Sequence, residues 1–140
     1  MFHVKHWIMN QKSETGKTGE DLACEYLKDK GYKILLRNYL QKWGEIDIIA
    51  KDPKGVLVFV EVKTMWQWFD KAHHELPNKI AELKPEDNMT ASKLRKVKRT
   101  ASLFAGSNED LVGETGWRVD LVAITMFHDK HCEINHYENV

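Results

Sequence analysis

The chain has 140 residues, of which 42% are hydrophobic and 30% are charged, so it can build the core of one domain and a mainly disordered protein is excluded. Lys and Arg together number 21 and so do Asp and Glu, which gives zero net charge and excludes a uniformly basic, tail-like protein. No apolar run approaches the roughly 18 residues that span a bilayer, and Cys24 and Cys132 alone do not make a disulfide framework, so we expect a cytoplasmic protein without a membrane partner.

The first half of the chain predicts a helix followed by strands. Residues 1–13 show no clear period, and we expect a loose leader before a single domain that spans residues 14–140. Residues 15–30 predict a helix, because Leu22, Ala23, Tyr26 and Leu27 recur at helical spacing. Gly31 closes this helix as a C-terminal glycine. Three strand segments follow, at residues 32–40, 44–50 and 56–63.

The second half predicts another helix and two strands. Residues 66–88 fit neither period, and their length makes them a candidate mobile loop. Residues 90–105 predict an amphipathic helix, residues 117–125 a buried strand, and residues 132–136 a weak edge strand. The resulting order, α-β-β-β-α-β-β, predicts an α/β fold with a mixed β-sheet flanked by helices.

The second and third predicted strands carry the residues with the clearest chemistry. Glu45 and Asp47 lie two positions apart and therefore share one face of their strand, as Glu61 and Lys63 do on the next. Between the strands, Pro53-Lys54-Gly55 fits a three-residue hairpin loop, with Gly55 in the left-handed conformation.

This loop sets the register of the two strands. It pairs Asp52 with Val56, and counting back then places Asp47 opposite Glu61, and Glu45 opposite Lys63. Carboxylates opposed in this way have Cβ atoms about 5 Å apart and repel each other. A divalent cation such as Mg²⁺ would relieve the repulsion, and the neighbouring lysine would stabilise a developing oxyanion or orient a water molecule. The alternative is a set of ordinary exposed ion pairs on an edge strand.

A third acid fits the same site. Glu20 shares a helical stripe with Gly16, Ala23 and Leu27, and this stripe is the one expected to meet the sheet. Because acids also favour the first turn of a helix for electrostatic reasons, a helix-dipole role is an equally good interpretation of Glu20.

Several ordered motifs resemble the bacterial YraN family. They are Gly-x-x-Gly-Glu-Asp-x-Ala from Gly16, Gly-Glu-Ile-Asp from Gly44, Phe-Val-Glu-Val-Lys from Phe59 and Trp-Arg-Val-Asp from Trp117. That family looks like a member of the PD-(D/E)xK nuclease superfamily, close to archaeal-type Holliday-junction resolvases. The resemblance implies a restriction-endonuclease-like fold and a Mg²⁺ or Mn²⁺ site. It implies that Asp47 and Glu61 are metal ligands, that Lys63 is catalytic, and that Glu20 matches a catalytic acid on the first helix of the resolvase-type members. We expect Glu45 to support these residues without binding the metal itself.

The chain departs from this pattern at three places. Ile46 stands where the superfamily name has proline, and Met65 stands where many relatives carry an arginine that would contact phosphate. Residues 66–88 form a longer segment than the usual loop of the family.

The predicted second helix is strongly basic. It holds five cations and no acid between residues 90 and 106, which leaves the rest of the chain with a net charge of −5. Such segregation is typical of phosphate binding, although a solvated helix face is an equally good interpretation of charge alone. The candidate nucleic-acid-binding residues are Lys93, Arg95, Lys96, Lys98 and Arg99.

Together these features predict a metal-dependent DNA endonuclease that hydrolyses phosphodiester bonds. We expect it to recognise DNA structure, such as a branched or single-stranded region, more than base sequence, in repair or recombination. The alternatives are a nucleic-acid-binding adaptor that does not cleave, and a subunit that acts only within a larger DNA-processing complex. The sequence leaves the oligomeric state open, a dimer included.

Overall fold

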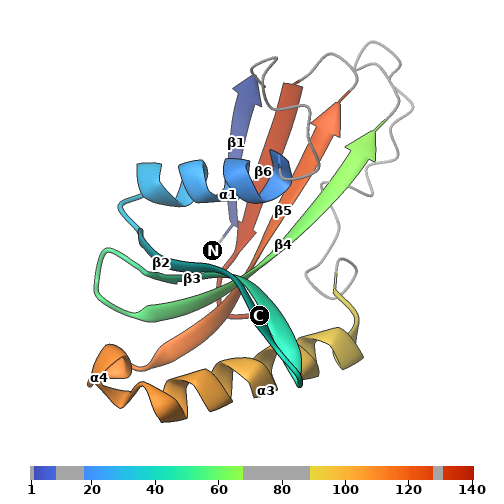
Figure 1. Cartoon of the computed structure of the whole chain (residues 1–140). Coiled ribbons are helices and arrows are strands. Elements are labelled where there is room, and N and C mark those ends of the chain that lie inside the picture. The colour runs from blue at the N-terminus through green and yellow to red at the C-terminus, as the bar shows by residue number, and fades with distance from the viewer. Residues whose placement is uncertain (1, 9–17, 68–88, 128–130) are drawn as a thin grey trace.

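A computed structural model describes residues 2–8, 18–67, 89–127 and 131–140 of the chain (Figure 1). Within these residues the strands form one six-stranded sheet in the order β1-β6-β5-β4-β3-β2. β4 and β5 run parallel, and the other neighbouring strands pair antiparallel. The elements are β1 (Phe2–Ile8), α1 (Thr18–Asp29), β2 (Lys33–Gln41), β3 (Gly44–Lys51), β4 (Leu57–Gln67), α3 (Ala91–Ser107), α4 (Glu109–Val112), β5 (Trp117–Phe127) and β6 (His131–Tyr137).

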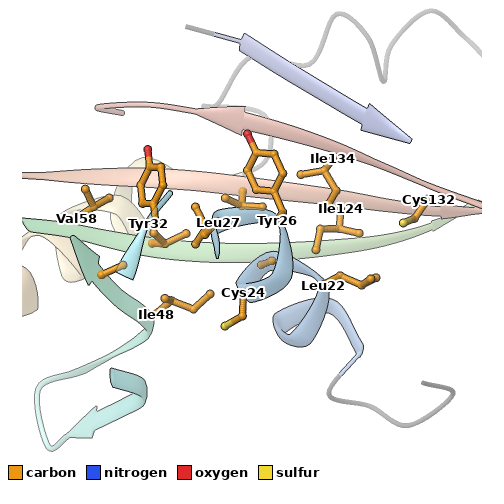
Figure 2. Close-up of a cluster of buried hydrophobic side chains, with 14 of the residues drawn as sticks. Leu22, Cys24, Tyr26, Leu27, Tyr32, Ile48, Val58, Ile124, Cys132 and Ile134 are labelled. Atoms are coloured by element: carbon orange, nitrogen blue, oxygen red, sulfur yellow. The ribbon is translucent and has the colours of Figure 1, made fainter. Parts of the chain in front are cut away.

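The predicted α/β class and the mixed sheet are confirmed, and α1 and α3 pack on opposite faces of the sheet. Under α1, a cluster of buried side chains joins the helix to β3, β4, β5 and β6 (Figure 2). Tyr26 and Leu27 are fully buried there. Under α3, Val97, Ala101 and Phe104 pack on Ile49 and Phe59 of the sheet. No helix in the described part of the chain is long and apolar enough to cross a membrane.

The N-terminal segment differs from the expected loose leader. Phe2–Ile8 form β1, which pairs antiparallel with β6 over its whole length. As a result β6 lies inside the sheet, between β1 and β5, and the prediction that it is an edge strand is wrong. The signal for β1 in the sequence is weak, because the alternation of apolar and polar residues that starts at Phe2 breaks at His6 and the pairing partner lies at the far end of the chain.

Residues 66–88, which fit neither a helical nor a strand period, are described only in part by the structure. Trp66 and Gln67 still belong to β4, which is longer than predicted. The remainder of the expected loop, residues 68–88, lies outside the described residues. The short helix α4 was not predicted.

The hairpin between β3 and β4 has the predicted loop. The Asp52 N–H donates to the Val56 carbonyl at 2.9 Å, and Gly55 adopts φ +85°. The Asp52 carboxylate accepts hydrogen bonds from the backbone N–H groups of Lys54 and Val56, both at 2.9 Å. These local bonds fix the turn and therefore the register of the two strands that leave it.

Candidate active site

The register of β3 and β4 brings two acids together. The strands pair from Lys51 with Leu57 to Ile48 with Val60, so the next position places Asp47 opposite Glu61, as the turn predicts. Regular pairing ends there, and the Val62 N–H donates to Oδ2 of Asp47 at 2.8 Å. In a regular antiparallel ladder this N–H would bond the backbone of the facing strand. A carboxylate has therefore taken the place of a backbone acceptor, at the point where the two strands stop pairing.

A cavity of about 340 Å³ lies at this point. Its walls come from the first turn of α1, the start of β3, the middle of β4 and the first turns of α3. The lining residues are Gly19, Glu20, Gly44, Glu45, Asp47, Glu61, Val62, Thr64, Lys93, Lys96 and Val97. The side chains of Asp47 and Glu61 enter the cavity from adjacent strands, and both residues are buried.

Two glycines allow the walls of the cavity to approach each other. A Cβ atom on Gly19 would overlap the Thr64 hydroxyl, and one on Gly44 would overlap the Thr100 hydroxyl. The first contact holds α1 against β4, and the second holds the start of β3 against α3. A side chain at either position would push a wall outward.

The surroundings of Asp47 disfavour the charged form of its carboxyl group. Burial, followed by the negative charge of Glu61, raises the pKa of Asp47 from its ordinary 3.8 to about 6. The charge of Glu45 adds to this rise, while the Val62 N–H and the charge of Lys93 oppose it. The site therefore favours a bound proton or a nearby cation.

Lys93 supplies one such cation. Its Nζ lies 2.7 Å from Oε1 of Glu61, and this hydrogen bond raises the pKa of Lys93 against the opposing effect of burial. Thr90 caps the N-terminus of α3 by accepting the Lys93 N–H at 3.1 Å, which fixes the start of the helix beside β4. Sequence reasoning placed Lys93 among the phosphate-binding residues and missed its contact with Glu61, because that contact joins two separate elements.

The other predicted site residues are divided between the cavity and the surface. Glu20 lines the cavity, and its Oε2 lies 3.7 Å from Nη2 of Arg37. Glu45 lines the cavity as well, but it is exposed. Lys63 is exposed and is not among the residues that line the cavity. The predicted pairing of Lys63 with Glu45 is not formed, because regular β3–β4 pairing ends at Ile48 and Val60.

The five predicted cations all lie on α3. Lys93 and Lys96 line the cavity, whereas Arg95, Lys98 and Arg99 are exposed farther around the helix surface. Positive charge on α3 therefore extends from the exposed helix surface to the cavity that contains Asp47 and Glu61.

The donor set of the cavity suits a hard cation. Asp47 and Glu61 offer carboxylate oxygens, and Mg²⁺ commonly binds through one or two carboxylates together with water and substrate phosphate. In the described parts of the chain, no group of three or more His, Cys, Asp or Glu side chains is arranged to hold a metal ion by itself. The residues fit Mg²⁺ or Mn²⁺ as a two-carboxylate site, with Glu20 in the wall beside it.

A second polar network, which was not identified from the sequence, holds the turn of the β3–β4 hairpin in place. Arg118 on β5 donates to Asp52 at 2.7 Å, to the Tyr32 hydroxyl at 2.9 Å and to Asp120 at 2.9 Å. Asp120 is fully buried and lies 2.8 Å from Nε2 of His136. The ion pair between Arg118 and Asp52 thus fastens the β3–β4 turn to β5. The only sequence signal was the Trp-Arg-Val-Asp motif that contains two of these residues.

The fold and the cavity define an α/β protein with an acidic pocket between two helices, at a break in the pairing of two strands. The model of the family described as "Uncharacterised protein family UPF0102" matches residues 19–124, a range that includes every residue lining the cavity. The chain belongs to the UPF0102 family, which confirms the resemblance to YraN proteins.

Similar proteins bear the same family name and are close to this chain in length. The UPF0102 protein of Thermotoga maritima is 39% identical over 109 residues, which cover 78% of this chain and 84% of the relative. That of Alkaliphilus oremlandii is 37% identical over 133 residues, which cover 94% and 98%. That of Carboxydothermus hydrogenoformans is 34% identical over 132 residues, with the same coverage.

Proposed function

We propose that this protein is a metal-dependent endonuclease that hydrolyses phosphodiester bonds in DNA, in the cytoplasm. The observation that carries the proposal is the pair of buried carboxylates, Asp47 and Glu61, which enter one cavity where β3 and β4 stop pairing. A sheet built only for stability would not keep two acids together at this position. This arrangement is what a cation site needs.

Asp47 and Glu61 would hold Mg²⁺ or Mn²⁺ through their carboxylate oxygens. A bound ion would supply Lewis-acid polarisation of the phosphate and a more acidic water molecule. Glu20 and Glu45 add negative charge at the wall of the cavity. Lys63 follows Glu61 by two residues on β4 and is our proposed partner for the attacking water or the developing charge.

The substrate class follows from α3. Lys93 and Lys96 bring positive charge into the cavity, and the exposed Arg95, Lys98 and Arg99 extend it along the helix. Cations placed in this way bind the phosphate backbone without reading base sequence. We therefore propose recognition of DNA structure, such as a branch or a single-stranded region, in repair or recombination.

The test is incubation of the full chain with branched, nicked, single-stranded and duplex DNA, in Mg²⁺, in Mn²⁺ and in EDTA. We expect cleavage in the metal-containing reactions, and its loss in Asp47→Asn and Glu61→Gln. Asp110→Asn, which removes an exposed acid on α4, is the matched control and should cleave like wild type. Cleavage that survives Asp47→Asn, or that persists in EDTA, would contradict the proposed site.

The second candidate is an adaptor that binds nucleic acid without cleaving it, alone or within a larger complex. The ion pair between Lys93 and Glu61 favours this function, because it already neutralises one acid of the pair. Salt-dependent DNA binding by wild type, with no cleavage of any substrate and no heat of Mg²⁺ binding, would support the adaptor.

A further inference from the structure

The turn between β2 and β3 directly precedes two residues that line the cavity, and it carries an aromatic side chain. It consists of Lys42 and Trp43, and both residues are exposed. Trp43 leaves 46% of its surface open to solvent. Two-residue hairpin turns favour small residues such as Asn and Gly, so the turn itself gives no reason for an indole here.

Trp43 is held next to the candidate active site by the residues that follow it. Gly44 and Glu45 both line the cavity, and the backbone of Gly44 packs directly against Thr100 of α3. Figure 1 shows the β2–β3 hairpin reaching α3. The Thr100 hydroxyl donates to the Lys96 carbonyl at 2.9 Å, and Lys96 also lines the cavity. The turn is therefore fixed at the rim, on the side of the basic helix.

The indole of Trp43 differs from that of Trp117, which is the first residue of β5. The Trp117 ring packs edge-to-face on Phe59, with ring centroids 5.6 Å apart, and so contributes to the core. Among the described residues, Trp43 has no such ring contact, and its neighbour in the turn is a lysine. A π-face beside a cation matches a nucleotide, with its flat base and its phosphate.

The charges around the turn indicate whether a second copy of the chain or a polyanion binds there. Lys42 and Lys96 are both positive and exposed, so a second copy of the chain docked on this rim would bring like charges together. A polyanion would be attracted instead. In continuous duplex DNA the bases are already stacked and paired, and only an unpaired base offers a free face to an indole.

We propose that Trp43 and Lys42 form a subsite for one unpaired nucleotide beside the cavity. The base stacks on the indole and its phosphate meets the lysine, so that DNA with a single-stranded arm binds better than continuous duplex. This inference rests on the proposed function in taking DNA as the substrate, and it names the feature of DNA structure that is read.

The test compares two labelled DNAs in EDTA, where cleavage does not interfere: a forked duplex and a continuous duplex of equal length. Base–aromatic stacking is worth about 1–3 kcal/mol, so Trp43→Ala should weaken fork binding by about 5-fold or more and change duplex binding less than 2-fold. Trp43→Phe should keep most of the fork affinity. Leu40→Ala, which removes an apolar side chain that is 71% exposed on the same hairpin, is the matched control and should change neither affinity.

A spectroscopic measurement checks stacking directly. With 2-aminopurine as the first unpaired base of the fork, wild type should quench its fluorescence on binding and Trp43→Ala should not. Equal quenching by both proteins, or an equal loss of fork and duplex affinity in Trp43→Ala, would overturn the subsite. Thermal unfolding of each variant confirms that the fold is intact.

The outcomes separate this inference from the proposed nuclease. Cleavage by wild type together with an unchanged fork preference in Trp43→Ala would leave the nuclease standing and overturn the subsite. Fork preference that depends on Trp43, with no cleavage by wild type, would overturn the nuclease and support the subsite.

Discussion

The ammonium group of Lys93 on α3 lies 2.7 Å from the Glu61 carboxylate on β4. This ion pair links the basic helix to the acidic strands, and it puts a positive charge where the proposed metal would bind. Lys93 and a divalent cation therefore compete for the same carboxylate. In the metal-free protein Lys93 limits the repulsion between Glu61 and Asp47, and substrate phosphate offers the lysine a new partner once a metal is bound.

This competition gives a prediction for Lys93→Met. Without the ammonium group the two acids repel freely, and we expect the free energy of unfolding of the metal-free protein to fall by about 1 kcal/mol, since Lys93 is half exposed and screened by solvent. We also expect Mg²⁺ to bind several-fold more tightly, as measured by calorimetric titration. Lys98→Met, which removes an exposed cation of the same helix, should change neither quantity. Weaker Mg²⁺ binding in Lys93→Met would contradict the competition.

The raised pKa of Asp47 predicts how stability depends on pH. Because its pKa is about 6 in the folded protein and 3.8 in the reference state, the folded state binds more protons between these values. The metal-free protein should therefore lose stability as pH rises from about 4 through 6, by up to about 3 kcal/mol. Denaturant unfolding over this range should show the loss in wild type and in Asp110→Asn, but not in Asp47→Asn. Saturating Mg²⁺ should reduce the loss.

The lowered pKa of Asp120 predicts the opposite pH dependence of stability in a more acidic range, where stability should fall as pH falls. Burial raises the pKa of Asp120, but the bonds from His136, Arg118 and the Asn139 N–H outweigh that effect and hold it below the ordinary 3.8. Its contribution to stability is present above that value and is lost as pH falls through the lower folded pKa. Asp120→Asn should cost about 3 kcal/mol at pH 7, because it leaves Arg118 short of a buried partner. Glu114→Gln on the surface should cost nothing measurable in the same denaturant titration.

The features that were predicted correctly from the sequence depend on residues that lie close together along the chain. The helical stripe around Tyr26 and Leu27 identified α1, and Asp52 with Gly55 fixed the turn that aligns Asp47 with Glu61. Each of these depends on neighbours along the chain or on simple counting from a turn. The predicted roles of Lys63, Glu20 and Glu45 remain predictions, although two of these residues line the cavity.

What the sequence did not predict depends on contacts between distant segments. β1 exists through backbone pairing with β6, and Lys93 meets Glu61 only after the chain crosses from β4 to α3. The bond from Arg118 to Asp52 likewise joins β5 to the β3–β4 turn, which lies 66 residues earlier in the chain. Periodicity shows which face of an element is apolar, but it carries no information on which charged side chains tertiary packing brings together.

The last prediction separates cleavage from binding by comparing Lys63 on β4 with two cations of α3. Lys63 is exposed outside the cavity wall and should matter in the transition state, where charge grows on the attacked phosphate. Lys63→Ala should therefore keep DNA affinity within a few-fold of wild type and abolish Mg²⁺-dependent cleavage. Substitution of Lys96 and Arg99 together by Ala should weaken DNA binding. It should also reduce the salt slope, which is the slope of the logarithm of DNA affinity against the logarithm of salt concentration, by up to about two, one for each lost phosphate contact.

The measurements are DNA affinity at several salt concentrations and single-turnover cleavage with saturating protein. Ser102→Ala, on the exposed side of α3, is the control and should match wild type in both. Cleavage that persists in Lys63→Ala would remove Lys63 from the mechanism and leave Lys93 as the lysine nearest the acids. An unchanged salt slope in the double variant would mean that α3 is a solvated helix face, and DNA would then have to reach Asp47 and Glu61 by another surface.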